Sequence, residues 1–255
     1  LHIKIAHVEA GLRSFDRRMP EEINRVLTDQ ISDFLFITCE SAKDNLLQEG
    51  IQEDKIFFVG NVMVDTLLYN MKKLERNTDN QEPITDGRDY AVLTLHRPSN
   101  VDVRETFERI SKALNTIAGH IPVIFPIHPR ARKQIKQFGF EKYYNGNIKL
   151  LEPLGYLDFL NLYSKSKFVL TDSGGIQEET AVLDIPCLTI RENTERPITV
   201  THGTNILVGT NEEKIVGEAY KILRGERKRR KVLKYWDGRA AERIVRILVE
   251  NRKKI

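Results

Sequence analysis

Cysteine and long apolar runs are what this chain most clearly lacks. Its only two cysteines, Cys39 and Cys187, lie far apart in separate apolar, strand-like segments. That spacing excludes a disulfide framework and a paired-cysteine metal site, and it indicates buried, reduced thiols of a cytoplasmic protein. A transmembrane helix needs about 18 consecutive apolar residues, and no such run is present. No signal peptide is visible either.

A strong charge of either sign is also missing. The chain has 40 Lys and Arg against 36 Asp and Glu, and the net charge of +4 is too small to indicate nucleic-acid binding. The basic run at 224–234 has no interleaved aromatic residues to support nucleic-acid binding, and most such runs are solvated helix faces. Because the histidines are scattered and the cysteines unpaired, no metal site is expected.

What the chain does contain is an alternation of short apolar runs with helix-like segments. This alternation is typical of an α/β fold with parallel strands, doubly wound from residue 90 onward. The length allows two modest domains, and the polar stretch 75–88 is expected to link them. After a first strand within residues 1–12, strands are expected at 34–39, 56–59, 90–95, 122–127, 148–151, 168–171, 187–190 and 205–208, and helices from Pro20 and at 40–50, 64–74, 105–118, 133–138, 156–163, 177–183, 214–223 and 240–254.

Polar residues gather in the loops that follow the strands of the second part. In doubly wound sheets, ligands bind beyond the carboxyl ends of the strands. Five loops are expected at that edge, and they carry most of the candidate functional side chains: 96–100, 128–130, 152–156, 173–179 and 191–197.

One of these loops links an apolar strand to a helix through Ser173, Gly174 and Gly175. Ser173 suits a helix N-cap, and the two glycines let another group approach the backbone closely. The first N–H groups of the helix can then bind an anion, while Glu179, about one turn further on, can accept hydrogen bonds from sugar hydroxyls. A nucleotide diphosphate and ribose would fit this pair. A tight turn without a ligand is the alternative.

His96 follows an apolar strand, where a histidine can act as acid or base or donate to a phosphate. It could instead only cap a backbone group. His128 has the equivalent place on the next strand, but the prolines around it favour a loop-shaping role. Glu9 and Glu21 flank an Arg-rich loop and could share acid and base roles. For Glu21, a helix N-terminal role is the simpler alternative.

Arg196 lies in the last of the five loops and could bridge a carboxylate or phosphate with two hydrogen bonds. Its alternative is a surface ion pair with Glu192 or Glu195. Tyr156 and Phe159 are at helical spacing, which by itself favours core packing over stacking on a base.

Several motifs, in order along the whole chain, together resemble the non-hydrolysing UDP-N-acetylglucosamine 2-epimerase family. They are His7–Arg13, Pro20–Arg25, Gly60-Asn61, Leu95–Asn100, Asp172–Glu179 and Thr194–Pro197. The resemblance implies the glycosyltransferase-B architecture of two Rossmann-like halves. It also implies interconversion of UDP-GlcNAc and UDP-ManNAc with no NAD or metal, through loss of the C2 proton and of UDP to give a 2-acetamidoglucal.

The resemblance also assigns residues. It implies that Glu9, Glu21 and His96 are the acid/base and substrate-contacting groups. It implies that Ser173, Gly174 and Gly175 form the diphosphate nest, that Glu179 binds the ribose, and that Arg196 and Phe159 make further contacts with the nucleotide sugar.

The implied domains are a remainder of the first Rossmann-like half at 1–61, a UDP-binding half at 62–240 and a helix crossing back at 241–255. Family members carry a further stretch before Leu1 with an Asp acid/base and an Arg for the nucleotide, so we expect an incomplete active site here, and a homodimer when full length. Two departures stand out. Leu154 replaces a Gln on the uracil side, and Pro98-Ser99 replaces the Arg-Glu of many bacterial members.

Other functions remain open at this point. A retaining sugar transferase would use the same diphosphate nest but needs an acceptor pocket. A hydrolysing epimerase would release free ManNAc and UDP. A binding module would hold UDP without chemistry. A nucleic-acid-binding basic helix would show binding that depends steeply on salt.

Overall fold

The computed structural model describes residues 3–76, 87–144 and 146–251. By backbone contacts the chain forms two compact units. Unit 1 comprises 1–72, 194–201 and 232–255, and unit 2 comprises 73–193 and 202–231. The chain therefore passes from one unit to the other at four places along its length.

Unit 2 is built on a six-stranded sheet in which every neighbouring pair is parallel. The strand order is β6-β5-β4-β7-β8-β9. Successive strands run outward from β4 in one direction and from β7 in the other, so the switch point of this doubly wound sheet lies between β4 and β7. The strands are β4 Ala91–Thr94, β5 Val123–Pro126, β6 Ile148–Leu151, β7 Phe168–Thr171, β8 Cys187–Thr189 and β9 Asn205–Leu207.

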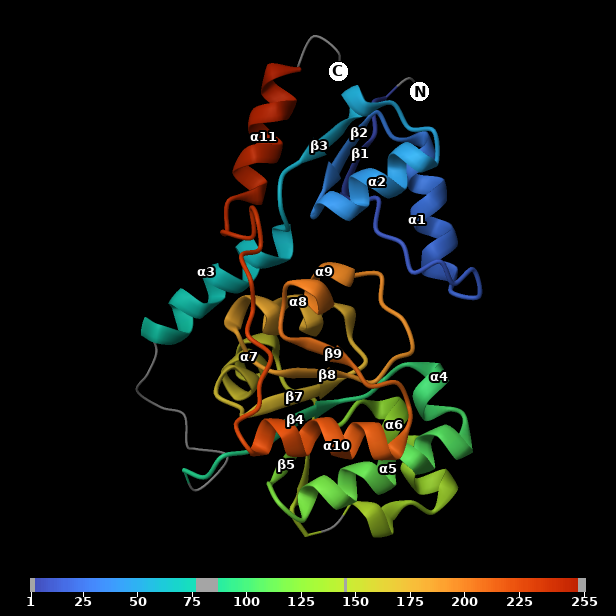
Figure 1. Cartoon of the computed structure of the whole chain (residues 1–255), viewed down its shortest axis with the longest axis vertical. Helices are drawn as coiled ribbons and strands as arrows, with labels where there is room; N and C mark the ends of the chain where they lie inside the picture. Colours follow the sequence, from blue (N-terminus) through green and yellow to red (C-terminus); the bar gives the residue numbers. More distant parts are fainter. Residues whose placement is uncertain (1–2, 77–86, 145, 252–255) are drawn as a thin grey trace. The chain divides into compact units, whose positions relative to one another are not determined.

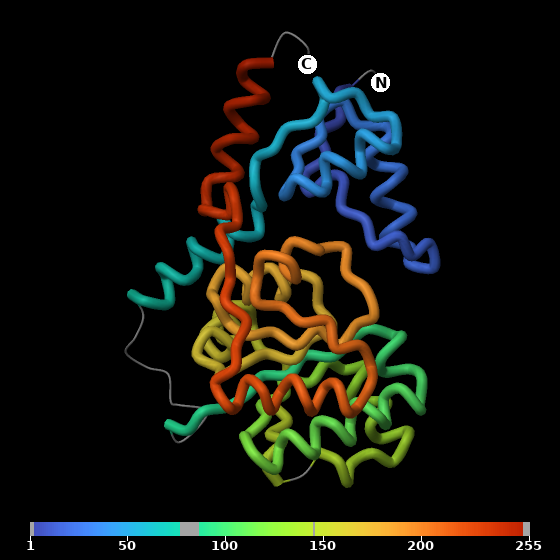
Figure 2. The backbone as a smooth tube through the Cα atoms, in the orientation of Figure 1, coloured from blue at the N-terminus to red at the C-terminus, as the bar shows by residue number. Residues whose placement is uncertain are grey.

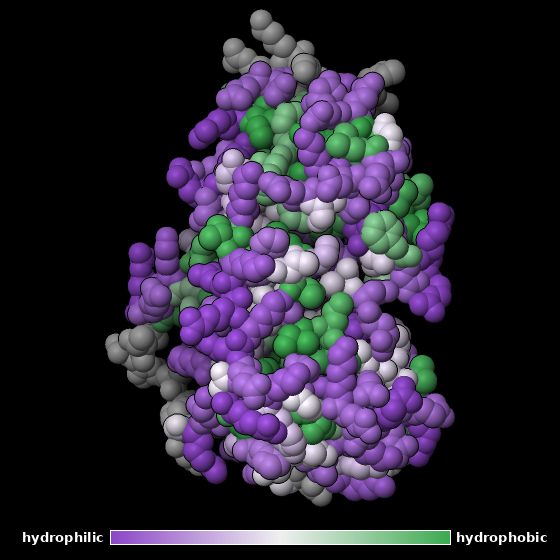
Figure 3. Space-filling model, in the orientation of Figure 1, coloured by the Kyte–Doolittle hydropathy of each residue, from purple (hydrophilic) through white to green (hydrophobic). Residues whose placement is uncertain are grey.

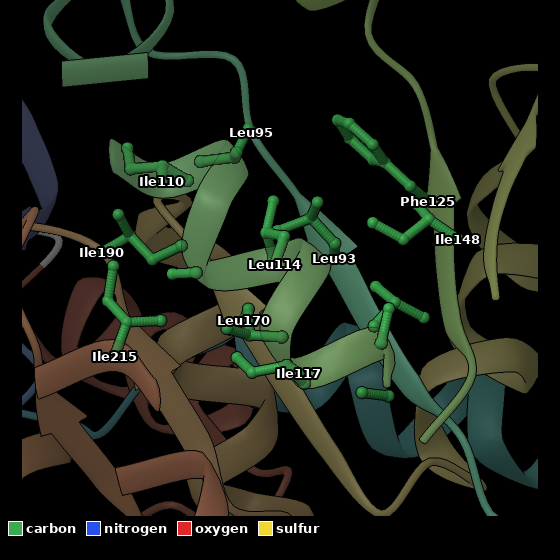
Figure 4. Packing of buried hydrophobic residues seen from close by; sticks show 14 of the residues in the cluster. Leu93, Leu95, Ile110, Leu114, Ile117, Phe125, Ile148, Leu170, Ile190 and Ile215 are labelled. Atoms are coloured by element: carbon green, nitrogen blue, oxygen red, sulfur yellow. The ribbon is translucent and has the colours of Figure 1, made fainter. Parts of the chain in front are cut away.

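Helices cover both faces of this sheet. One face carries α5 Arg104–Ala118, α6 Pro129–Phe138 and α10 Glu212–Leu223, and the other carries α7 Tyr156–Ser164 and α8 Gly174–Leu183 (Figure 1). The apolar positions of α5 recur at helical spacing and are fully buried against strand residues such as Leu93 and Phe125 (Figure 4). Two short elements, α4 Pro98–Val101 and the 3₁₀ turn Glu141–Tyr143, complete the unit.

Unit 1 contains a smaller parallel sheet in the order β1-β2-β3. Phe34 and Phe36 of β2 pack with Val59 and with Ile244 of the C-terminal helix. The elements are β1 Ala6–Ala10, β2 Phe34–Ile37, β3 Ile56–Phe58, α1 Pro20–Ile31, α2 Glu40–Gln48, the 3₁₀ turn Glu53–Lys55, α3 Val62–Arg76 (which continues into unit 2), α9 Pro197–Thr201 and α11 Ala240–Glu250.

This division differs from the predicted domain boundaries after residues 61 and 240. The Asp65 carboxylate of α3 accepts hydrogen bonds from the backbone N–H of Ala240 (3.0 Å) and Ala241 (2.7 Å). Ile198 of α9 packs against the core of the small sheet. These contacts join segments more than a hundred residues apart in the sequence.

All the predicted strands and helices have a counterpart within the described residues, with ends that shift by a few residues, and residues 252–254 of the last predicted helix lie outside the described part. Helix α6 begins at Pro129 instead of residue 133, because Pro suits the first turn and the His128 ring accepts a hydrogen bond from the Arg130 N–H. Helix α8 begins at Gly174, three residues early. The short helices α4 and α9 were not predicted. Of the predicted linker, residues 77–86 lie outside the described part.

The basic run 224–234 does not lie on a helix face, although most such runs do. Residues 226–233 are not helical and run between α10 and α11 (Figure 2). The Lys231 N–H donates to the His202 carbonyl at 2.6 Å, and the Arg230 guanidinium donates to the Val182 carbonyl. One backbone and one side-chain hydrogen bond thus tie this segment to the rest of unit 2.

Most of the surface in the space-filling view is hydrophilic, with small, separate hydrophobic patches (Figure 3). Among the described residues, no helix has the length and apolar character needed to cross a membrane.

A test of unit 1 uses two glycines with left-handed backbone. A Cβ on Gly60 (φ +89°) would lie 2.0 Å from the Tyr235 carbonyl oxygen, whereas a Cβ on Gly50 (φ +82°) meets no described atom within 4 Å. We expect Gly50→Ala to cost about 1 kcal/mol of unfolding free energy from backbone strain alone, and Gly60→Ala about 3 kcal/mol or more, since backbone must move.

The measurement is urea unfolding followed by fluorescence of the chain's single tryptophan, Trp236, which is buried in unit 1 with its indole N–H on the Thr38 carbonyl. Equal losses for the two variants would contradict the clash at Gly60.

Candidate functional site

The two strands at the switch point of unit 2 bring two loops together. The hydroxyls of Thr94 and Thr171, at the ends of β4 and β7, are 2.7 Å apart. The loop after β4 carries His96, and the loop after β7 carries Asp172 and then Ser173. The ligand-binding edge that the sequence predicts for a doubly wound sheet therefore holds two of the predicted residues, His96 and Ser173, on neighbouring loops.

Asp172 is fully buried, and its carboxylate organises this edge. It accepts hydrogen bonds from the backbone N–H of His96 (3.1 Å) and of Arg97 (2.9 Å), and from the side-chain amide of Asn100 (3.2 Å). The Nδ1 atom of His96 lies 2.8 Å from its other oxygen. Burial works to raise the pKa of Asp172, but these hydrogen bonds and His96 outweigh it and hold the pKa below its ordinary value.

The contact with Asp172 sets the chemistry of His96. A carboxylate can only accept, so Nδ1 carries its proton toward Asp172 and the neutral ring keeps Nε2 as the free acceptor. The imidazole is 44% exposed, so a substrate can reach it. Asp172 belongs to one of the sequence motifs but is assigned no role from the sequence alone. Its position between a buried strand and Ser173 is the signal that could have indicated one.

A pocket of about 190 Å³ adjoins His96. The rings of His96 and His128 have centroids 5.9 Å apart, and Phe159 of α7 is half-buried on the pocket wall. The core packing expected for Tyr156 is wrong, since Tyr156 is 41% exposed, whereas Phe159 is half-buried and contacts the buried ring of Tyr163. The loop-shaping role of His128 is confirmed by its cap on α6. The pocket is lined by Thr94, Leu95, His96, Pro126, His128, Pro153, Leu154 and Phe159.

Ser173, Gly174 and Gly175 form the start of α8, with Ser173 at the N-cap. The Ser173 N–H donates to the Thr171 hydroxyl at 2.9 Å. Within the described residues the Ser173 side chain makes no capping bond, so the first N–H groups of the helix depend on another acceptor. An anion such as a diphosphate would meet that need.

Glu179 lies in the same helix and is 3% exposed. Its Oε1 accepts a hydrogen bond from the Tyr156 hydroxyl at 2.7 Å, and its Oε2 accepts one from the Tyr163 hydroxyl at 2.6 Å. Burial raises the pKa of Glu179, and the two hydroxyls only partly offset this. Sequence reasoning missed the role of Tyr163, because α7 and α8 meet only in the folded chain.

In unit 1, Glu9 sits on an irregularity in the pairing of β1 with β2 and has a left-handed backbone (φ +66°). This conformation is costly for a residue other than glycine and is typical of functional sites. The Arg196 guanidinium lies 3.9 Å from the Glu9 carboxylate and is ion-paired to Glu195. Glu195 is one of the two partners expected for Arg196, but its side chain is 2% exposed, so this pair is not the surface ion pair that the sequence suggested.

Glu21 is exposed in the first turn of α1, and its neighbour Glu22 is buried. Glu22 accepts from the backbone N–H of Ser14 and pairs with Arg25 at 2.6 Å, and Arg25 lies 3.8 Å from Glu195. An alternating series of charges thus joins α1 to Glu9. Sequence reasoning assigned no role to Glu22, Arg25 or Glu195 in it.

The predicted site residues divide between the units. Unit 2 holds the pocket, the helix start and the buried glutamate, while unit 1 brings Glu9 and Arg196 together and places Glu21 on α1. No group of three or more His, Cys, Asp or Glu able to hold a metal occurs in the part of the chain that the structure describes.

Comparison with known proteins gives consistent matches. The sequence model of the family described as UDP-N-acetylglucosamine 2-epimerase matches residues 1–249. A UDP-N-acetylglucosamine 2-epimerase from Methanocaldococcus jannaschii is 51% identical, covering 97% of this chain and 69% of that protein. A UDP-2,3-diacetamido-2,3-dideoxy-D-glucuronate 2-epimerase from Pseudomonas aeruginosa is 41% identical, covering 98% and 69%.

Among solved structures, that of the M. jannaschii UDP-GlcNAc 2-epimerase in complex with UDP-GlcNAc and UDP matches with a TM-score of 0.85 at 48% identity, covering 97% of this chain and 69% of that one. The likeness confirms the predicted fold class, α/β with parallel sheets of the glycosyltransferase-B type. On both the sequence match over 1–249 and this structural likeness, the chain belongs to the UDP-N-acetylglucosamine 2-epimerase family.

Proposed function

We propose that the protein is a UDP-N-acetylglucosamine 2-epimerase, an isomerase that interconverts UDP-GlcNAc and UDP-ManNAc. Family membership supports this, as does the complex of a similar enzyme with UDP-GlcNAc and UDP. The observation that carries the proposal is the switch-point edge of unit 2, where His96 on Asp172 adjoins an uncapped helix start and a buried glutamate. An acid/base group thus lies beside groups suited to a nucleotide diphosphate.

In this proposal unit 2 holds the UDP. The diphosphate binds the N–H groups at Ser173, Gly174 and Gly175, where the dipole of α8 favours negative charge. Glu179 accepts hydrogen bonds from the ribose hydroxyls, and Phe159 offers an aromatic surface on the pocket wall. Arg196 of unit 1 supplies a positive charge for the phosphates or the sugar.

The reaction is an elimination followed by re-addition. A base removes the C2 proton while the bond from C1 to the UDP oxygen breaks, which leaves a C1–C2 double bond in a 2-acetamidoglucal. UDP then re-forms its bond to C1 as a proton is delivered to the opposite face of C2. No oxidant is required. Glu9, Glu21 and His96 are the proposed acid/base and substrate-contacting groups, since the two faces of C2 need separate ones.

Two further features belong to the proposal. Both cysteines are free and buried, which favours a cytoplasmic location. A homodimer is proposed for the full-length protein. One competing substrate has specific support, a UDP-linked diacetamido-glucuronate, because a relative at 41% identity carries that name.

The defining test is proton NMR of UDP-GlcNAc in D₂O with this chain and with a version extended upstream. With the extended version we expect UDP-ManNAc to form with deuterium at C2, because each elimination exchanges that proton with solvent. The diacetamido-glucuronate substrate is run in parallel. Preferential turnover of that substrate, or release of free ManNAc, would contradict the proposed activity.

Asp172→Asn tests whether the Asp172 carboxylate determines the tautomer of His96. An amide can donate to Nδ1 and so favour the wrong tautomer, and we expect kcat to fall about 100-fold with KM nearly unchanged. The matched control is Asn100→Ala, which removes another hydrogen bond to Asp172 but leaves its contact with His96. A folded Asp172→Asn variant with normal kcat would show that His96 needs no partner.

The raised pKa of Glu179 predicts the pH dependence of UDP binding. The ionised form is the better acceptor, so affinity is complete above the raised pKa and is lost as pH falls through it, above the ordinary value of 4.5. Calorimetric titration of UDP between pH 5 and 8 measures this. UDP itself also titrates, so the result is taken relative to Glu179→Gln. Parallel pH profiles for both proteins would count against the assignment.

A further inference from the structure

One face of helix α7 presents three aromatic side chains to the proposed nucleotide site. Tyr156, Phe159 and Tyr163 stand at positions i, i+3 and i+7, which share one side of a helix. Phe159 lines the pocket beside His96, while the two tyrosines reach Glu179 on α8. Phe159 and Tyr163 also contact each other, with ring centroids 5.1 Å apart.

The hydrogen bonds to Glu179 are divided evenly between its two oxygens. Oε1 accepts from Tyr156 at 2.7 Å and Oε2 accepts from Tyr163 at 2.6 Å. A carboxylate has about four acceptor positions, two on each oxygen. One position on each oxygen therefore remains, and the two tyrosines fix the plane in which they lie. Two acceptors held in one plane match the two vicinal hydroxyls of a ribose.

Both tyrosines stay protonated donors near neutral pH. Burial and the adjacent Glu179 charge raise the pKa of each above its ordinary value of 10. Tyr163 is fully buried, whereas Tyr156 is partly exposed in the first turn of α7. The Glu179 carboxylate is thus held by the buried Tyr163 at one oxygen and by the partly exposed Tyr156 at the other.

We propose that Tyr156 and Tyr163 are positioning residues that make Glu179 selective for nucleotides with an intact ribose cis-diol over 2′-deoxyribonucleotides. This inference rests on the proposed function, since it requires Glu179 to face the ribose of bound UDP. It adds two residues that act through Glu179 and a specificity that they set.

The test is calorimetric binding of UDP and 2′-deoxy-UDP to the complete chain and to Tyr156→Phe and Tyr163→Phe. One lost hydrogen bond changes affinity about tenfold, so we expect the wild type to prefer UDP by about that factor. In each Phe variant the preference should fall to about threefold or less, with the affinity for 2′-deoxy-UDP within about twofold of wild type. A merely structural defect would weaken both ligands alike.

The matched control is Tyr90→Phe. The Tyr90 hydroxyl donates to the Leu162 carbonyl of the same helix at 2.7 Å and does not touch Glu179 in the described contacts. This variant removes a hydrogen bond that holds α7 but not one that holds the carboxylate. Its preference for UDP should equal that of the wild type.

Glu179→Gln distinguishes the proposed role of the two tyrosines from the proposed ribose-binding role of Glu179. Loss of the preference in Glu179→Gln and in both Phe variants supports the inference. Loss in Glu179→Gln alone overturns the inference and leaves the ribose role of Glu179 in place. An unchanged preference in Glu179→Gln, or no binding of UDP by the wild type, overturns both.

Discussion

The buried carboxylate of Asp172 is the interaction on which the nucleotide-binding edge of unit 2 depends. It lies at the one position where the order of strands reverses, so it faces the loop of the neighbouring strand instead of the next loop in sequence. Removing a carboxylate from water is costly unless hydrogen bonds replace the solvent. Here the replacement comes from two backbone N–H groups, an asparagine amide and His96. The energetic need of one buried charge thereby fixes the path of the β4 loop and the orientation of its histidine.

In unit 1, buried charges are compensated by other charged side chains. Glu22, Arg25, Glu195 and Arg196 alternate in sign and end at Glu9, so each buried or half-buried charge has an opposite neighbour. Removing one member would leave a partner uncompensated, which is costly at low exposure. His96 in unit 2 and Glu9 in unit 1 thus belong to networks of charged groups, whereas Glu21 is exposed on α1. The left-handed backbone at Glu9 persists because the surrounding contacts determine it.

Most of the fold could be predicted from the sequence, and rather less of the site. Apolar runs and turn residues located every predicted strand, because a parallel sheet buried on both faces needs such runs. The N-cap position of Ser173 was predicted, because capping is a local property, although the helix itself was expected to begin only at residue 177. The roles of Asp172, Tyr163 and the Arg25 series were missed, since each depends on partners that only the folded chain brings near. The proposed roles of Glu9, Glu21 and Arg196 remain predictions.

The passage of the chain between the units has a consequence for how the protein is made. Unit 1 includes residues near the start of the chain, but its contacts with Ile198, Trp236 and Ile244 come from segments made after most of unit 2. Domains usually fold as they emerge during synthesis, with the N-terminal one first. Here unit 2 has all its strands before unit 1 has its last helix, so the contacts that Trp236 and Ile244 make in unit 1 form only after the whole sheet of unit 2 has been synthesised. The packing of β2 against the last helix is therefore completed late in synthesis.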